Sequence, residues 1–271
     1  MKIPQLRKQT EKKNCHGYSW EDDYSWIHQD NCLEILRDTK KLNPEVRKYL
    51  EEENSYTKEV MKDTENLQKK IFKEIEGRIK LDDESLPFKD KKYDYWTKTT
   101  KEGNYAKKLR KKIGSDKVEC YFDGDLEAKG KKFFSTGDLA VSNNDEFLAF
   151  SVDDKGGEYF TIFVRRIADN KIIEKIEDTA GGIVWSYDDK SFFYRKHDEQ
   201  HRARKIFQHI LGTSSKKDKL IFEEKSERFT CSIGTSTCEN FYFIETSEHT
   251  TSEIYYFHKE EKIFEPKLFI K

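Results

Sequence analysis

The chain has 271 residues, of which 38% are charged and 14% are aromatic, and its formal net charge at pH 7 is −1. The charged share exceeds the roughly 25% of an average domain, but disordered chains are poor in aromatic residues, so we expect a folded protein with a very polar surface. The balanced net charge gives no electrostatic support for a nucleic-acid partner.

The cysteines and the N-terminus indicate the compartment. Five cysteines are scattered without a C-x-x-C pair, at Cys15, Cys32, Cys120, Cys231 and Cys238. An odd, dispersed set favours reduced thiols in the cytoplasm over a disulfide framework or a zinc site. The charged N-terminus lacks the apolar core of a signal peptide, and no apolar run approaches about 18 residues. We therefore expect a cytoplasmic protein with no membrane span, no metal and no cofactor.

Residues 16–57 form an aromatic and acidic segment, from His16 to Ile27, followed by a capped helix. Asn43 is a good N-cap and Pro44 suits the first helical position. One face of this helix collects Val46, Tyr49, Leu50, Glu53, Tyr56, Val60 and Met61. We interpret the whole segment as a docking element.

A second helix follows before Lys80. Asp63 and Thr64 favour caps over helix interiors and are expected to break the first helix. The second helix carries apolar residues on one side, at Leu67, Ile71, Phe72, Ile75 and Ile79. Lys and Glu cover the other side, which is the usual solvated face. Pro87 is expected to end this helical N-terminal extension, which we assign to residues 1–87.

Residues 88–271 have the pattern of many short strands. Tyr93, Tyr95 and Thr97 alternate with other residues, and Ile162 and Val164 alternate with Phe163 and Arg165. Turn signals separate such runs, at 102–104, 123–125, 143–145, 156–157, 181–182, 188–190 and 212–214. This pattern predicts an all-β architecture.

A repeat refines this prediction. Residues 139–150 align with residues 183–194, so that Ser142 matches Ser186, and a weaker third copy ends at Phe243. Each copy reads as strand, Ser/Asp turn and strand. Repeats of about 40–50 residues with four strands mark β-propeller blades, so we expect a partial propeller of about four blades, with a β-sandwich as the alternative.

The helical extension and the repeats together resemble the N-terminal region of the prolyl oligopeptidase family of serine peptidases, most closely its oligopeptidase B branch. The resemblance is carried by His16-Gly17, 22–26, 43–57, 78–80 with 83–87, 93–96, 102–105, 139–142, 179–185 and 251–253. It implies a helical extension that packs against a C-terminal α/β-hydrolase domain, and a propeller that admits only short peptides to the active site. It also implies cleavage after Lys or Arg.

The catalytic part of that family does not match any residue here. The nucleophile would lie in a G-x-S-x-G elbow, followed by Asp and His. Gly212-Thr213-Ser214-Ser215-Lys216 and Gly234-Thr235-Ser236-Thr237-Cys238 both fail at the last position. We therefore assign no catalytic, cofactor-binding or metal-binding residue, and expect the hydrolase domain to be absent and this chain alone to be inactive.

Other motifs are weaker. The segment His197-Asp198-Glu199-Gln200-His201 is not H-E-x-x-H and is expected to be a solvated hairpin loop. We expect Gly181-Gly182 to form a turn, because no phosphate-loop Lys follows. Asp22-Asp23 is interpreted as cap or domain-contact groups. The basic run Lys107–Lys112 is interpreted as a solvated strand edge or loop.

The sequence leaves two other functions open. The chain could be a free-standing β-propeller-like module that binds a protein or peptide, or a decayed gene product without activity. An open set of four blades exposes strand edges and apolar faces, so we expect marginal stability and aggregation unless a second chain completes the fold. The reading frame directly downstream distinguishes a split peptidase from a remnant.

Overall fold

The structure is a computed structural model and describes residues 2–261 and 263–270. The chain divides into two compact units, residues 1–81 and residues 82–271, which are described separately. The division lies a few residues before Pro87, because the strand β3 (Asp83–Glu84) already pairs with the strand β5 (Tyr93–Thr99).

The first unit is mainly helical but begins with a hairpin. The strands β1 (Glu11–Cys15) and β2 (Tyr18–Asp22) pair antiparallel, and His16 and Gly17 form the turn with φ of 50° and 83°. The unit continues through η1 (Ser25–Ile27), α1 (Cys32–Arg37), η2 (Thr39–Lys41), α2 (Pro44–Val60), η3 (Lys62–Thr64) and α3 (Glu65–Glu76). The hairpin was not predicted, whereas the two long helices and the break at Asp63-Thr64 are confirmed.

Helix α2 has the predicted N-cap. The Asn43 side-chain oxygen accepts hydrogen bonds from the backbone N–H groups of Glu45 (2.8 Å) and Val46 (3.4 Å), and Pro44 opens the helix. These bonds satisfy two donors that have no partner inside the helix.

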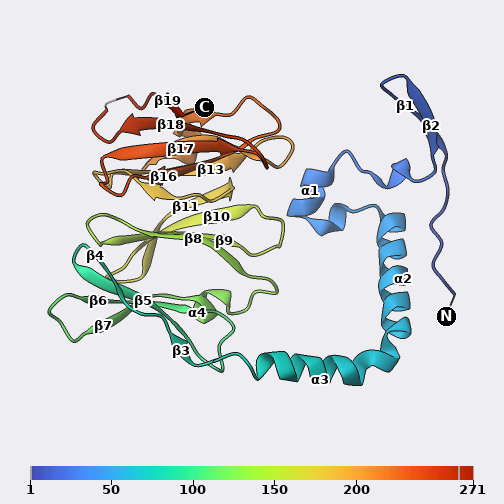
Figure 1. Cartoon of the computed structure of the whole chain (residues 1–271), viewed down its shortest axis with the longest axis horizontal. Coiled ribbons are helices and arrows are strands. Elements are labelled where there is room, and N and C mark those ends of the chain that lie inside the picture. Colours follow the sequence, from blue (N-terminus) through green and yellow to red (C-terminus); the bar gives the residue numbers. More distant parts are fainter. Residues whose placement is uncertain (1, 262, 271) are drawn as a thin grey trace. The chain divides into compact units, whose positions relative to one another are not determined.

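The second unit consists of four antiparallel sheets stacked along the chain (Figure 1). We call them blades 1 to 4. Blade 1 contains β3, β4 (Phe88–Asp90), β5, β6 (Lys107–Lys112) and β7 (Val118–Asp123). Blade 2 contains β8 (Ser135–Val141), β9 (Phe147–Asp153), β10 (Phe160–Arg166) and β11 (Lys171–Thr179). Blade 3 contains β12 (Val184–Trp185), β13 (Ser191–His197), β14 (Ala203–Ile210) and β15 (Lys219–Glu223). Blade 4 contains β16 (Thr230–Thr235), β17 (Phe241–Ser247), β18 (Ser252–His258) and β19 (Lys267–Ile270).

Two short helices interrupt the β pattern of this unit. They are α4 (Gly124–Ala128), between blades 1 and 2, and η4 (Ser215–Lys217), inside blade 3. At α4 the sequence indicated only a turn. The Asp123 side chain accepts a hydrogen bond from Leu126 N at 3.2 Å, which caps the helix.

The predicted repeat has a common turn geometry. Ser142, Ser186 and Ser236 each begin the turn that joins the first two strands of blades 2, 3 and 4. Their hydroxyl oxygens accept hydrogen bonds from the backbone N–H five residues later, at 2.9 Å, 3.0 Å and 3.1 Å respectively. The repeat is therefore structural: each serine closes the first turn of its blade.

These turns meet at one end of the unit and join the blades. The Asp189 carboxylate of blade 3 accepts hydrogen bonds from the backbone N–H groups of Asn143 (2.7 Å) and Asn144 (2.8 Å) in blade 2. Lys91 of blade 1 donates to Asn143 Oδ1 at 2.7 Å and lies 3.6 Å from Glu239 Oε1 of blade 4. Charge-assisted bonds thus connect all four blades on this side.

The core lies between successive blades, so the inner strands are buried on both faces. In β13, the four residues from Ser191 to Tyr194 are all buried. One cluster fills the space between blades 3 and 4 and consists of Phe193, Ile206, Ile221, Cys231, Tyr242, Ile244 and Phe257. Such double burial is why β13 shows a continuous apolar run rather than a simple alternation.

Candidate functional site

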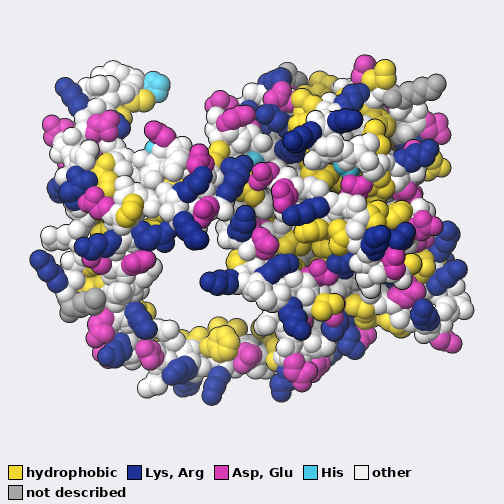
Figure 2. Space-filling model, turned by 180° about the vertical axis from the view of Figure 1, so that it is seen from behind, with side chains coloured by type: hydrophobic (Ala, Val, Ile, Leu, Met, Phe, Trp, Pro, Cys, Tyr) yellow, Lys and Arg dark blue, Asp and Glu magenta, His cyan; other side chains and the backbone are white. Residues whose placement is uncertain are grey.

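The most exposed apolar surface of the first unit follows α3. No residue of this helix is buried, although its sequence is strongly amphipathic. Helix α3 ends at Glu76, so Ile79, which the sequence placed on this helix, lies just after it. The apolar stripe of α3 and this extension has exposed fractions of 57% at Leu67, 46% at Ile71, 64% at Phe72, 56% at Ile75 and 57% at Ile79. Figure 2 shows apolar side chains along one side of this segment and charged side chains along the other. We call these five residues the α3 stripe. A contiguous exposed stripe of this kind marks an interaction surface.

Further apolar side chains of the first unit are also exposed. On α2 and just after it, Leu50, Val60 and Met61 are exposed, whereas Val46 is buried. In the hairpin, Tyr18 is 78% exposed and Trp20 is also exposed. The predicted apolar helix face therefore exists, but within this chain only its first residue is fully covered.

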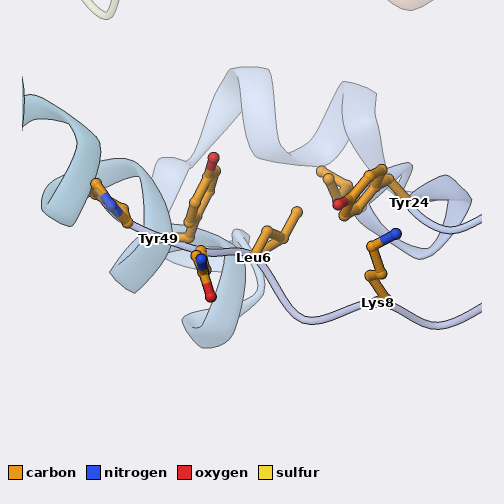
Figure 3. A pocket seen from close by; sticks show the side chains of 7 residues that line it. Leu6, Lys8, Tyr24 and Tyr49 are labelled. Carbon is orange, nitrogen blue, oxygen red and sulfur yellow. The ribbon is translucent and has the colours of Figure 1, made fainter. Parts of the chain in front are cut away.

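A cavity of about 750 Å³ lies within the first unit, between the N-terminal segment and α2. Its lining consists of Pro4, Gln5, Leu6, Lys8, Tyr24, Ile27 and Tyr49. Figure 3 shows Leu6 between Tyr49 and Tyr24, with Lys8 beside Tyr24. The Lys8 ammonium lies 5.9 Å from the centroid of the Tyr24 ring. The lining is mostly apolar and aromatic, which suits the docking of an apolar side chain.

Arg7 fixes the N-terminal segment against α2. Arg7 forms a two-point ion pair with Glu45, at 2.9 Å and 3.2 Å, and lies 4.7 Å from the Trp26 ring centroid. The Trp26 indole N–H in turn donates to the Arg7 carbonyl at 3.0 Å. The aromatic residue that the sequence placed in a docking element thus also organises this unit internally.

Asp22 and Asp23 both accept hydrogen bonds inside the first unit. Asp22 accepts a hydrogen bond from Tyr24 N at 2.8 Å, just before η1. Asp23 accepts from Lys8 Nζ (2.6 Å) and Thr10 Oγ1 (2.7 Å), and these hydrogen bonds, with that of Lys8 the stronger, lower the pKa of Asp23. Asp22 therefore makes a local bond and is not the predicted helix cap, because η1 has no side-chain cap hydrogen bond, and Asp23 holds the N-terminal segment.

The second unit has an open apolar face on blade 4. Tyr242 and Ile244 of β17 are buried, whereas the intervening Phe243 and its neighbour Phe241 lie on the other face of the sheet. There Phe269 lies 6.0 Å from Phe243 and 5.7 Å from Tyr256, measured between ring centroids, and is 60% exposed. An aromatic face at the last blade is suited to further β-structure.

The sequence suggested that the basic run Lys107–Lys112 is a solvated strand edge or a loop, and this interpretation is wrong. The run is β6, which pairs with β5 on one side and β7 on the other. Arg110 is buried and pairs with Glu119 at 3.1 Å, and Lys107 pairs with Asp123 at 2.8 Å. Long basic side chains can cover apolar surface with their stems, so a central strand tolerates this composition.

The serine and glycine motifs have structural roles. Ser214 caps η4 by accepting from Lys216 N, and Ser236 closes the first turn of blade 4. Gly181 and Gly182 lie before β12 with positive φ of 67° and 76°, which glycine adopts readily, but they form no turn, contrary to the prediction. The backbone here bonds to Arg195 instead, through Ala180 N and the Gly181 carbonyl. A Cβ atom at Gly182 would lie 2.3 Å from Arg195 Nε, so this close approach also needs the absence of a side chain.

The loop from His197 to His201 is only partly solvated, contrary to expectation. The rings of His197 and His201 stack at 4.2 Å, and Tyr159 lies against both. Asp198 is buried, pairs with Arg204 and accepts from the backbone N–H groups of Gln200 (2.8 Å) and Arg202 (2.9 Å). Burial raises the pKa of Asp198, but these partners outweigh it and lower the pKa overall. The polar composition of this loop therefore gave no indication that Asp198 is buried and hydrogen-bonded to the backbone.

A second cavity, of about 700 Å³, lies beside the β17–β18 loop and is lined by Arg202, Glu227, Arg228, Thr230, Ser247, Glu248 and His249. Glu248 accepts hydrogen bonds from Thr250 and from Thr251 Oγ1 (3.1 Å), and lies 3.7 Å from Arg228. The Thr250 bond contributes most to holding the pKa of Glu248 at about 2, below the ordinary 4.5.

We therefore expect the Glu248 carboxyl to titrate near pH 2 in the folded chain. Its contribution to stability is fully present above about pH 4.5 and is lost as the pH falls toward 2, because the pKa is lower in the folded state. Carbon-detected NMR titration measures this midpoint directly. Thr250→Val should move it upward. A wild-type midpoint near 4.5, or no change in the variant, would contradict the assignment.

Together, the stacked four-stranded sheets and their repeated serine turns define this chain as a partial β-propeller with a mainly helical N-terminal unit. The prediction of about four blades is confirmed. The chain belongs to the family described as the prolyl oligopeptidase N-terminal beta-propeller domain, whose profile matches residues 4–270.

Curated relatives support this assignment. The chain is 28% identical to "Dipeptidyl aminopeptidase BI" of Pseudoxanthomonas mexicana, over 88% of this chain and 34% of that protein. It is 27% identical to "Protease 2" of Moraxella lacunata, over 94% of this chain and 37% of that protein. The chain therefore spans little more than a third of the length of these relatives.

Solved structures show the same fold. Oligopeptidase B from Leishmania major superposes with a TM-score of 0.87 at 25% identity, covering 98% of this chain and 39% of that one. Oligopeptidase B from Trypanosoma brucei, in its closed form with covalently bound antipain, gives a TM-score of 0.85 at 23% identity and again 39% of that chain. This chain corresponds to the N-terminal part of such peptidases, and the resemblance seen in the sequence is confirmed.

Proposed function

We propose that this chain is the N-terminal arm and propeller part of an oligopeptidase-B-like serine endopeptidase that hydrolyses short peptides after Lys or Arg. The residues that perform the chemistry would lie in an α/β-hydrolase domain outside this chain. This chain would bind that domain and restrict access to its active site.

The observation that carries the proposal is the α3 stripe. An amphipathic helix in a globular protein normally covers its apolar side, and full burial of one such side chain contributes about 1.5–3 kcal/mol. All five residues of the stripe are exposed instead. A docking partner of the size of a domain would account for this exposure.

The structure of the second unit is compatible with the proposed restriction of access to the active site. Blades 1 to 4 are joined at one end by the Lys91, Asn143, Asp189 and Glu239 contacts. A propeller has a narrow central channel, so only small or extended molecules can pass it. Selection for short peptides then follows from size rather than from a specific binding pocket.

We also propose a cytoplasmic location, supported by the cysteines. All five thiols are free, and burial raises the pKa of the Cys231 thiol to about 12. The other four thiols are exposed, and free thiols that remain unpaired at a surface suit a reducing compartment. No helix in the described part of the chain is long and apolar enough to cross a membrane.

A chimaera tests the proposal. This chain would replace the matching N-terminal segment of Protease 2 from Moraxella lacunata, and the product would be assayed with chromogenic peptides that end in Arg, Lys or Ala. We expect serine-inhibitor-sensitive turnover of the Arg and Lys peptides. A folded, monodisperse chimaera without turnover, beside an active parent enzyme, would refute the proposal.

A further inference from the structure

A buried group of titratable side chains joins blades 2 and 3, and the function proposed above does not use it. His209 of β14 is 1% exposed and lies between two carboxylates. Its Nδ1 is 2.8 Å from Asp218 Oδ1, and its Nε2 is 3.5 Å from Glu174 Oε2. Asp218 precedes β15 of blade 3, whereas Glu174 lies in β11 of blade 2. The imidazole therefore connects acidic groups of two blades.

Both carboxylates are largely shielded from water, and each already accepts one hydrogen bond. The side chains of Asp218 and Glu174 are 1% and 15% exposed, respectively. The Tyr194 hydroxyl of β13 donates to Asp218 Oδ2 at 2.7 Å. The backbone N–H of Gly212 donates to Glu174 Oε1 at 2.5 Å. One oxygen of each carboxylate is thus left to face His209.

These two carboxylates are the charged groups that face the imidazole. Beside it on β13 lies the uncharged ring of Phe192, with 5.2 Å between the ring centroids. Among the residues that the structure describes, β11, β13, β14 and the β14–β15 loop bring no charged group other than Glu174 and Asp218 within ion-pairing distance of His209. The Nε2 atom makes no hydrogen bond in the described part of the chain, so a proton there is balanced by Glu174 alone.

The number of protons on the imidazole decides whether both contacts are attractive. The imidazolium form carries an N–H on each ring nitrogen, so it attracts Asp218 and Glu174 together. The neutral form carries one N–H, and its other nitrogen then presents a lone pair to a carboxylate oxygen. A buried site offers little water to relieve that unfavourable contact, so the neutral form favours separation of the imidazole from one carboxylate.

We propose that His209 is a pH-sensitive clamp between blades 2 and 3, which is closed when the imidazole is protonated and loosened when it is neutral. The segment expected to move is the β14–β15 loop, residues 211–218. Both of its ends are tied to the cluster, because Gly212 is bonded to Glu174 and Asp218 is bonded to the imidazole. This inference does not depend on the proposed peptidase role.

The loosening is expected to stay local. Elsewhere between the same two blades the Trp185 indole N–H donates to the Ala140 carbonyl at 2.9 Å, a bond that histidine protonation does not change. Blades 2 and 3 should therefore remain packed while the β14–β15 loop loses protection.

Hydrogen exchange of the whole chain tests the clamp, measured by mass spectrometry at pH 6 and pH 8 and corrected for the intrinsic pH dependence of exchange. Histidine changes charge in this range. The closed form holds the proton, so raising the pH favours the loosened form, and we expect the opening equilibrium of residues 211–218 to rise about tenfold. Ring-nitrogen NMR should show His209 protonated on both nitrogens at pH 6. Equal protection at both pH values, or a single protonated nitrogen at pH 6, would overturn the inference.

Two variants localise the response. His209→Gln removes the titratable ring, and Glu174→Gln removes one of the two charges with little change in shape. Neither variant has an imidazole between two charges, so we expect each to reduce the pH response of residues 211–218 to less than about twofold. Glu174→Gln changes a side chain that is 15% exposed and serves if His209→Gln fails to fold.

Two matched controls carry the same substitutions elsewhere. Glu177→Gln replaces an exposed carboxylate on the same strand as Glu174, and His249→Gln replaces an exposed histidine between β17 and β18. Both should keep the response of the wild type. A response that survives both clamp variants, or that His249→Gln removes, would refute the clamp.

Discussion

Replacing Phe193 by alanine is expected to destabilise the second unit by about 3–5 kcal/mol, the range for truncating a fully buried Phe. Phe193 is 0% exposed and lies in the cluster between blades 3 and 4. Its ring centroid is 5.0 Å from that of Tyr242, 5.3 Å from Phe264 and 5.6 Å from Phe257. The cavity left by the ring cannot collapse easily, because rigid rings surround it on three sides. Since a domain of this size is stabilised by only about 5–15 kcal/mol, this loss is a large share of the total.

Urea denaturation followed by tryptophan fluorescence measures this loss. The matched control is Phe72→Ala in α3, where the ring is 64% exposed and the expected change is within about 0.5 kcal/mol. Equal stability of the two variants would contradict the packing between blades 3 and 4.

Replacing Ile71 and Ile75 together by serine is expected to lower the stability of the protein only when a hydrolase domain is present. In this chain alone both side chains are more than two-fifths exposed, at 46% and 56%, so the change in stability should stay within about 0.5 kcal/mol. In the chimaera with Protease 2 the same side chains would be buried. There the double variant should lose about 3–6 kcal/mol, from about 1.5–3 kcal/mol for each side chain.

Thermal unfolding of the chain and of the chimaera, each with and without the substitutions, gives the comparison. Lys69→Ser with Lys73→Ser is the matched control, because it has the same four-residue spacing on the charged side of α3. It should leave both proteins unchanged. If the Ile71/Ile75 variant melts at the wild-type temperature in the chimaera, the α3 stripe does not contact the hydrolase domain.

Much of the fold could be predicted because local chemistry and spacing agreed. Asn43 and Pro44 defined a helix start that depends only on neighbouring residues. Ser142 and Ser186 defined the blade repeat, because each serine closes a turn within five residues. Signals of this kind are read from a single sequence without knowledge of distant contacts.

The features that were missed depend on contacts from elsewhere in the chain. The run Lys107–Lys112 contains only one apolar residue in six, so its composition did not indicate a buried strand. It is a central strand because it pairs with β5 and β7. The turn of the hairpin β1–β2 consists of His16 and Gly17, both at positive φ. His is not one of the usual residues of such a turn, so only Gly17 indicated a hairpin in the sequence. Asp198 appeared solvated because the Arg204 that pairs with it belongs to the following strand.

The most direct test of the central claim is hydrolysis by the isolated chain. We propose that residues 1–271 bind the hydrolase domain and restrict access to it, and that the other domain breaks the peptide bond, so purified protein should not release chromophore from Arg- or Lys-terminated peptides above the buffer rate. Turnover that co-purifies with the chain and is abolished by a serine-directed inhibitor would contradict it.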